Sequence, residues 1–174
     1  MLKGSEIAPA TPRDEGRWLR DILGRFATGV VAVTAVEPAS GEPVGLVMNS
    51  FTSVSLTPPL VAMCVAHTSS SWPRVRSASA LCLNILSDRQ GELSARFASS
   101  GRDKFRGVRW TCSPAGAPII DGCLAWLECE VVTEHATGDH MLVVARVLRA
   151  DHNGAGNPLV FYHSRYVTVS GGMP

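Results

Sequence analysis

The sequence predicts a mostly β protein with short helices, in which about six or seven strands form a closed or nearly closed barrel. Apolar, β-branched segments of strand length recur along the 174 residues, helix-like periodicity is confined to short stretches, and the segments lack βαβ regularity. Closure is expected because it removes exposed strand edges. A chain with 45% hydrophobic residues can bury one sizeable core, so we expect a single domain at 17–169, between a flexible N-terminal segment at 1–16 and a tail at 170–174.

The expected elements follow from local periodicity. Apolar residues at three- and four-residue spacings predict a helix from Arg17 to Phe26 that packs against a sheet. Alternation from Cys123 to His135 predicts a strand with Glu128 and two further glutamates on its polar face. Short helices are expected at 70–78 and 90–97, and strands at 29–36, 44–54, 60–66, 81–86, 123–135, 141–148, 159–162 and 166–169.

Composition excludes several classes of partner. The net charge of +1 creates no broad field for nucleic acid or an anionic membrane surface. The longest apolar run, 60–66, is far shorter than the roughly 20 residues that cross a bilayer, and the N-terminus lacks the apolar segment of a secretory signal. Five cysteines without a C-x-x-C pair indicate reduced thiols, mostly in the core. We therefore expect a soluble cytoplasmic protein.

Three common chemistries lack their motifs. Gly154-Ala155-Gly156 has no third glycine and no P-loop exists, which excludes both nucleotide fingerprints. Neither the histidines nor the cysteines have zinc-ligand spacing, so we expect no metal. The nucleophile elbow of a serine hydrolase is also missing.

The segment from Val47 to Ser55 is unusually polar for a strand, with one amide and four hydroxyl groups in nine residues. Alternation could simply point Asn49, Phe51, Ser53 and Ser55 to solvent. Alternatively, small hydroxyls and exposed backbone N–H groups would let a planar, phosphorylated ligand approach the main chain. The cluster from His67 to Trp72 adds three serines and the start of a helix, which favours a phosphate, whereas an ordinary N-cap would explain one serine.

Four segments, Phe26-Ala27-Thr28-Gly29-Val30, Asn49 to Ser55, Pro58-Pro59-Leu60 and Asp103-Lys104-Phe105, resemble the flavin reductase-like family in order and spacing. The likeness runs from about Trp18 to Tyr166 and is strongest to the small reductase components of two-component monooxygenases. It implies an FMN-binding split β-barrel with Greek-key-like connections, and a homodimer. It also implies hydride transfer from NADH, or NADPH, to FAD or FMN, and a partner monooxygenase that receives the reduced flavin.

The same resemblance assigns site residues. His140, in Gly138-Asp139-His140, would position the nicotinamide as the catalytic residue, and Tyr166 would bind NAD(P)H with it. Met48 stands where the family often has threonine, so one hydrogen bond to the flavin ring is expected to be missing. Without the resemblance, Lys104 reads as a solvated charge and His140 as a turn residue. The expected flavin contacts are Val47, Met48, Asn49, Ser50, Ser53, Val54, Ser55, Ala66, Ser70, Ser71, Lys104 and Phe105.

Two rival functions stay open at this stage. A split barrel could carry flavin, haem or deazaflavin without turnover, because a fold does not fix a function. A related oxidase of a pyridoxamine phosphate-like substrate is disfavoured, since no arginine cluster accompanies the hydroxyl-rich motifs.

Overall fold

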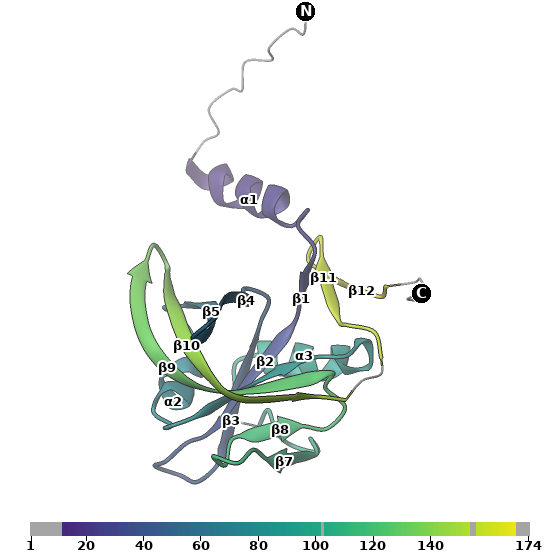
Figure 1. Ribbon diagram of the computed structural model, residues 1–174. Helices are drawn as coiled ribbons and strands as arrows, with labels where there is room; N and C mark the ends of the chain where they lie inside the picture. The colour runs from purple at the N-terminus through teal and green to yellow at the C-terminus, as the bar shows by residue number, and fades with distance from the viewer. Residues whose placement is uncertain (1–11, 102, 154–155, 170–174) are drawn as a thin grey trace, which may run out of the picture.

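A seven-stranded antiparallel sheet forms the body of the protein (Figure 1). The computed structural model describes residues 12–101, 103–153 and 156–169; the N-terminal segment expected at 1–16 lies largely outside these ranges, and the tail at 170–174 wholly so. In spatial order the strands are β3 (Pro43–Met48), β2 (Val31–Val36), β6 (Leu81–Ile85), β9 (Ala125–Thr137), β10 (His140–His152), β5 (Pro59–Ala66) and β4 (Thr52–Leu56). Sheet neighbours such as β2 and β6 are distant in sequence, as Greek-key-like connections require. The predicted split-barrel fold is confirmed.

Smaller elements surround this sheet. Strands β1 (Thr28–Gly29), β11 (Val160–Tyr162) and β12 (Arg165–Val167) form a three-stranded sheet, and β7 (Trp110–Cys112) pairs with β8 (Pro118–Ile120). The helices are α1 (Pro12–Leu23), α2 (Trp72–Arg76), the 3₁₀ turn η1 (Asp88–Gln90) and α3 (Gly91–Ala98). None of the helices within the described ranges is long and apolar enough to span a membrane.

The core lies on both faces of β2, which explains its uninterrupted apolar sequence. Val31, Val33 and Ala35 point into the barrel, whereas Ala32 and its neighbour Val30 face a second cluster that contains Phe97 of α3. Because side chains alternate along β2, this one strand contributes residues to two separate hydrophobic clusters. Phe97 comes so close to β3 that a Cβ on Gly45 would lie 2.7 Å from its ring, which explains the glycine there.

The barrel is open between its two edge strands. The strand expected at 44–54 is wrong: β3 ends at Met48, Asn49–Phe51 is irregular, and β4 begins at Thr52. The Ser50 hydroxyl donates to the Cys64 carbonyl at 2.8 Å and accepts from the Cys64 N–H at 3.0 Å. One side chain therefore satisfies the backbone of β5 where a neighbouring strand would otherwise pair with it.

Helix α1 departs from two expectations. It begins at Pro12 and ends at Leu23, not at Arg17 and Phe26, because proline suits a first helical turn and Gly24 disfavours continuation. It also does not bury its apolar face against any sheet among the described residues: it stands apart from the barrel (Figure 1), and its apolar side chains are exposed. Their exposed fractions are 53% for Trp18, 47% for Leu19, 46% for Ile22 and 62% for Leu23, and Phe26, just after the helix, is 76% exposed.

The polar face expected for β9 is also partly wrong. Glu128 is fully buried, because its carboxylate accepts hydrogen bonds from Arg149 at 2.8 Å and from the N–H of Ala115 at 2.7 Å. A strand that is covered on both faces can carry a charge inward when that charge is paired. The helix expected at 70–78 is shorter than predicted, and the strand expected at 141–148 is longer, extending to His152 as β10.

Candidate functional site

A polar cavity of about 410 Å³ lies beside the opening of the barrel. Its walls come from the end of β3, the end of β5, the loop that leads into α2, and the end of α3 with the residues that follow. All of these are element ends, where backbone groups and short side chains can face a ligand. The lining residues are Leu46, Val47, Met48, Asn49, Ser50, Cys64, Val65, Ala66, Thr68, Ser69, Ser70, Ser71, Phe97, Ala98, Ser99, Ser100, Lys104 and His140.

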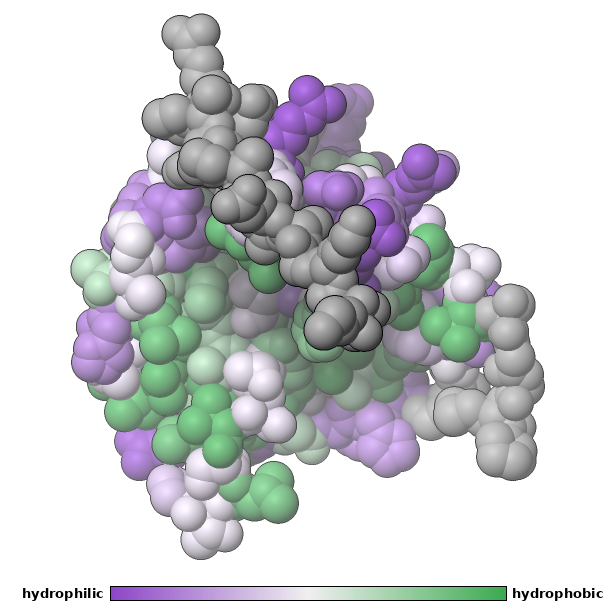
Figure 2. All heavy atoms as spheres, turned by 90° about the horizontal axis from the view of Figure 1, so that it is seen from above, coloured by the Kyte–Doolittle hydropathy of each residue, from purple (hydrophilic) through white to green (hydrophobic). Residues whose placement is uncertain are grey.

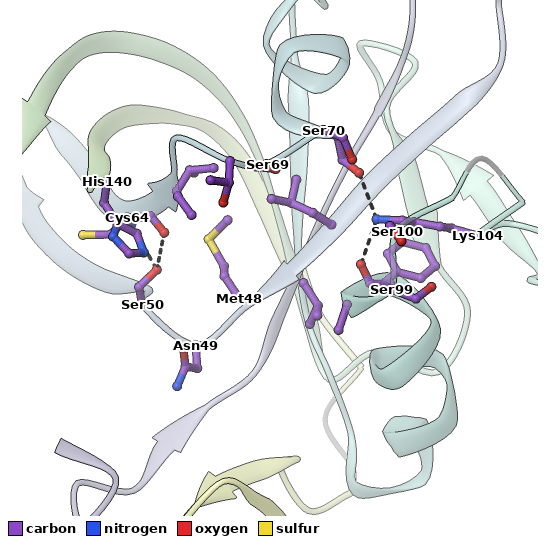
Figure 3. Close-up of a pocket in the computed structure, with 18 residues that line it drawn as sticks. Met48, Asn49, Ser50, Cys64, Ser69, Ser70, Ser99, Ser100, Lys104 and His140 are labelled. Carbon is purple, nitrogen blue, oxygen red and sulfur yellow. Dashed lines mark hydrogen bonds between the residues drawn. The ribbon is translucent and has the colours of Figure 1, made fainter. Parts of the chain in front are cut away.

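The cavity has two chemically different ends (Figure 3). His140 lies near Ser50 and Cys64 at one end, whereas Lys104 lies with Ser99 and Ser100 at the other. Met48 projects between the two groups. A ligand that spans the cavity would therefore meet an imidazole at one end, an apolar thioether in the middle and a cation at the other end.

The lysine end is built by three segments that converge on one ammonium group. Lys104 Nζ donates to the carbonyl of Gly45 on β3 at 3.2 Å, to Ser71 Oγ before α2 at 2.8 Å, and to the carbonyl of Phe97 on α3 at 2.9 Å. The residue is only 7% exposed, and burial, together with the charge of Arg74, lowers the pKa of Lys104. The sequence alone would have placed this lysine in solvent.

The histidine end is set by the turn between β9 and β10. His140 Nδ1 lies 2.6 Å from Asp139 Oδ1. Because a carboxylate can only accept, Nδ1 carries the proton, and this hydrogen bond lowers the pKa of Asp139. The backbone N–H of His67 also donates to the Asp139 carbonyl at 3.0 Å, which joins the turn to the loop after β5.

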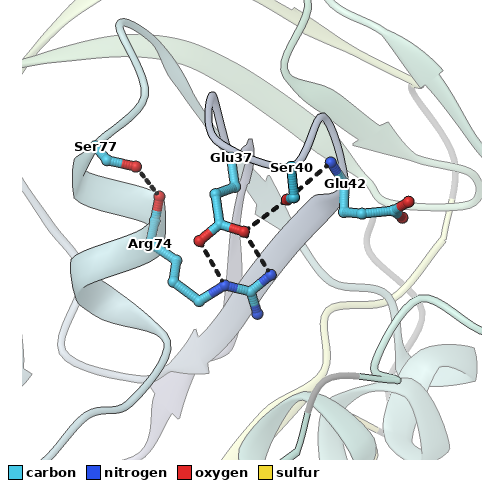
Figure 4. A network of polar contacts seen from close by, with 5 residues as sticks. All are labelled: Glu37, Ser40, Glu42, Arg74 and Ser77. Atoms are coloured by element: carbon cyan, nitrogen blue, oxygen red, sulfur yellow. Dashed lines mark hydrogen bonds and ion pairs between the residues drawn. The ribbon is translucent and has the colours of Figure 1, made fainter.

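Helix α2 is fixed to the β2–β3 connection by a forked ion pair (Figure 4). Arg74 donates through two nitrogens to the carboxylate of Glu37, at 2.8 and 2.9 Å, and Ser40 donates to the same carboxylate at 2.6 Å. A bidentate pair of this kind fixes the relative orientation of the two side chains as well as the distance between them. It therefore orients the helix whose N-terminal loop lines the cavity.

The structure brings most of the predicted site residues together. The cavity is lined by Val47, Met48, Asn49, Ser50, Ala66, Ser70, Ser71, Lys104 and His140. They come from segments far apart in sequence, joined by the pairing of β5 with β10, in which Ala66 is opposite His140.

Five predicted residues lie outside this cavity in the single chain. Ser53, Val54 and Ser55 belong to the edge strand β4, beyond the irregular segment that separates it from β3. The Phe105 ring packs on Phe97 with centroids 5.0 Å apart. The Tyr166 hydroxyl lies 2.7 Å from Ser94 Oγ on α3. Their assigned contacts with flavin or nucleotide stay predictions.

Several lining residues are not predicted by the sequence. Cys64 lies in an apolar strand and gives no signal of its own. Ser99 and Ser100 end α3, and only their small polar side chains after a helix could have indicated them. Thr68 and Ser69 belong to the hydroxyl cluster at 67–72, but the family resemblance assigns no flavin contact to them.

These features fit a flat ligand with an anionic group. A volume of about 410 Å³ is within the range of small-molecule sites, roughly 300–1,000 Å³. Unpaired hydroxyls and a buried ammonium at one end suit a phosphate, and the apolar middle suits a ring. The residues present therefore fit a flavin nucleotide.

Comparison with known proteins agrees with this geometry. Residues 23–170 match the model of the flavin reductase like domain. The chain is 42% identical over 150 residues to a flavin reductase of Pseudomonas putida, covering 86% of this chain and 88% of that protein. It is 38% identical over 162 residues to the flavin-dependent monooxygenase reductase subunit HsaB of Rhodococcus jostii, covering 93% and 82%. The NADH:FAD oxidoreductase SgcE6 of Streptomyces globisporus, solved with NAD and FAD fragments, superposes with a TM-score of 0.84 at 32% identity, covering 94% and 98%.

Proposed function

This chain belongs to the flavin reductase like domain family, and from that premise we propose that it transfers hydride from NADH to FMN or FAD and supplies the reduced flavin to a partner monooxygenase. It is a flavin reductase, and its cofactors are a flavin and NADH. The observation that carries the proposal is one cavity with His140 at one end and Lys104 at the other, because a flavin reductase needs a place for the nicotinamide beside the flavin ring and a site for the flavin phosphate.

The residues that would hold the flavin divide by chemistry. Ser70 and Ser100 provide hydroxyl donors at the cationic end, and Val47 and Met48 provide apolar contact in the middle. The Ser50 hydroxyl is already bonded to β5, so Ser50 would contribute mainly through its backbone. When bound, the flavin supplies the ring that accepts the hydride.

The task of this chain is positioning. His140 would orient the nicotinamide, and Asp139 fixes the tautomer of its imidazole by accepting from Nδ1. The cavity walls would hold two rings in contact and limit the access of water. No proton transfer by a side chain is required for hydride transfer, so most single substitutions should reduce the rate modestly.

The decisive experiment is NADH oxidation by the purified protein with titrated FMN, FAD and riboflavin. We expect NADH absorbance to fall only when a flavin is present. Flavin binding without any loss of NADH absorbance would instead support the non-catalytic carrier. NADPH, assayed in parallel, determines the preferred donor.

We also propose that the protein is a homodimer. The exposed apolar side chains of α1 are suited to an interface, since isolated exposure of this extent on one helix face is unfavourable. Viewed from the α1 end, hydrophobic side chains cover a broad part of the surface (Figure 2).

We further propose that the protein is cytoplasmic. The five free thiols support the cytoplasm as the compartment of this protein.

A further inference from the structure

The ammonium of Lys104 has no hydrogen left for a ligand. An ammonium has three N–H donors, and Gly45, Ser71 and Phe97 supply three acceptors at 3.2, 2.8 and 2.9 Å. These acceptors belong to β3, the start of α2 and the end of α3, which are the walls of this end of the cavity. The ammonium therefore joins three walls to one another.

Two serines beside this junction keep their hydroxyls unused. Ser70 directly precedes Ser71, and Ser100 follows Phe97 by three residues. Within the ranges that the structure describes, neither hydroxyl has a hydrogen-bond partner, and both residues line the cavity. Ser99 differs, because its hydroxyl donates to the Arg96 carbonyl at 2.7 Å. Ser70 and Ser100 are thus side-chain donors that no described group engages, and the position of each depends on a residue that Lys104 holds. Ser71 also keeps its own hydroxyl hydrogen, because it only accepts from Lys104.

The charge of Lys104 is also uncompensated by the protein. None of the ion pairs among the described residues involves it. Of the elements around it, β3 carries no charge, and Arg74 of α2 is paired with Glu37. On its own loop Asp103 pairs with Arg106 at 3.7 Å, and Arg96 of α3 donates to the Arg106 carbonyl. A buried cation without a counter-charge favours an anion in the adjoining cavity.

We propose that Lys104 is a positioning residue, which holds β3, the start of α2 and the end of α3 together so that Ser70 and Ser100 bind the flavin phosphate, while its ammonium attracts that phosphate without a hydrogen bond to it. This proposal rests on the proposed function, since it assumes that flavin occupies the cavity. It assigns the direct contacts to two serines and the organising role to the lysine.

The test compares Lys104→Met and Lys104→Arg with wild type. Met removes the charge and all three hydrogen bonds at similar length, whereas Arg keeps the charge but has a planar fork that does not match the three acceptors. We expect the KM for FMN to rise about tenfold in both variants, and the KM for riboflavin, which lacks the phosphate, to change less than about twofold. Ser70→Ala and Ser100→Ala should each raise the KM for FMN about threefold or more. Arg109→Gln, which removes an exposed charge, is the matched control for loss of net charge.

A second measurement needs no flavin. Hydrogen exchange of the flavin-free protein should become faster at residues 69–71 and 97–100 in both Lys104 variants, with the β9–β10 hairpin unchanged as the sign of an intact fold. If the KM for FMN rises while exchange in these segments is unchanged, Lys104 is a direct phosphate ligand and the proposal is overturned. An equal rise in the KM for FMN and the KM for riboflavin would overturn the proposal as well. So would a KM for FMN in Lys104→Arg that equals the wild-type value.

Failure of the proposed function would look different. A wild-type protein that oxidises no NADH would contradict the reductase, but flavin binding followed by fluorescence and hydrogen exchange would still test Lys104. Conversely, if the protein oxidises NADH while Lys104 substitutions leave its preference for FMN over riboflavin unchanged, that result would contradict only the positioning role.

Discussion

His140 Nδ1 and Asp139 Oδ1 are 2.6 Å apart, so the imidazole that faces the cavity is oriented by its own chain neighbour. The pair sits in the β9–β10 turn, opposite Ala66 of β5, and its geometry is therefore set by strand pairing. This arrangement places the imidazole at the opposite end of the cavity from the Lys104 ammonium (Figure 3).

Asp139→Asn should impair the use of NADH. The amide can no longer act as a charged acceptor for Nδ1, and the imidazole becomes free to rotate or change tautomer. We expect the KM for NADH to rise roughly three- to tenfold, with the KM for flavin unchanged. His140→Ala should have a larger effect in the same direction.

Asp151→Asn provides the control in steady-state kinetics, because Asp151 and His152 form a second Asp-His sequence at the far end of β10. If Asp139→Asn raised the KM for NADH and the KM for flavin to the same extent, the role of Asp139 in orienting His140 for NADH would be contradicted.

Affinity for FMN should decrease at alkaline pH through Lys104. Burial and the charge of Arg74 lower the pKa of Lys104, so its ammonium loses its proton below the pH at which a free lysine would. As pH rises through this lowered pKa, attraction for the phosphate is lost. Fluorescence titrations should therefore show weaker FMN binding at high pH in wild type and a flatter profile in Lys104→Met. Riboflavin corrects for titration of the ring itself; an identical pH profile for both flavins would exclude Lys104 as the cause.

Ile22→Glu should dissociate the proposed homodimer. Ile22 lies among the exposed apolar side chains of α1, and a charge placed in a buried apolar interface is strongly unfavourable. Sedimentation velocity is expected to show a dimer for wild type and a monomer for the variant. Arg20→Gln, on the same helix, is the matched control, because it also changes the net charge by one negative unit. A wild-type protein that sediments as a monomer at all concentrations would refute the interface.

Glu128→Gln should destabilise the fold without touching the site. Burial alone would raise the pKa of Glu128, but hydrogen bonds from Ser113, the Ala115 N–H and Arg149 outweigh it and lower the pKa. The stabilisation by a carboxylate with a lowered pKa is present above its ordinary pKa and is lost as pH falls through the folded-state value.

Urea unfolding at about pH 7 should therefore show Glu128→Gln to be less stable by about 1–3 kcal/mol. The difference in the free energy of unfolding between wild type and variant should become smaller in acid. If that difference became larger on acidification, the pKa of Glu128 would not be lowered in the folded state.

Thiol labelling of the native protein should divide the cysteines into two groups. Burial raises the pKa of Cys82, raises that of Cys123 to about 11 and raises that of Cys129 to about 12, so these thiols are both covered and protonated. Cys112 is exposed and Cys64 half-buried in the cavity. We expect Cys112 to react first, Cys64 next and more slowly when flavin is present, and the other three only after unfolding. Mass spectrometry of the labelled peptides distinguishes them.

Several elements were predictable because they depend on local order. The alternating or continuous apolar character of 60–66 and 81–86 indicates strands whatever their partners are, and β5 and β6 are found there. The polar residues that follow β3, Asn49 and Ser50, likewise marked part of the cavity. The strand at 44–54 failed because periodicity does not show where the barrel opens, and Ser50 is bonded across that opening to a residue 14 positions away.

The sequence by itself determined a mostly β fold, the hydroxyl clusters and, through its motifs, the family. Only the tertiary structure decided that Lys104 is buried while the apolar face of α1 is exposed. Both findings are the opposite of what composition suggests, and the physical reason is the same. Burial depends on contacts with residues that are distant in sequence, which composition does not show. Lys104 finds its acceptors 59, 33 and 7 residues away, on three different elements, and α1 finds no cover among the described residues of its own chain.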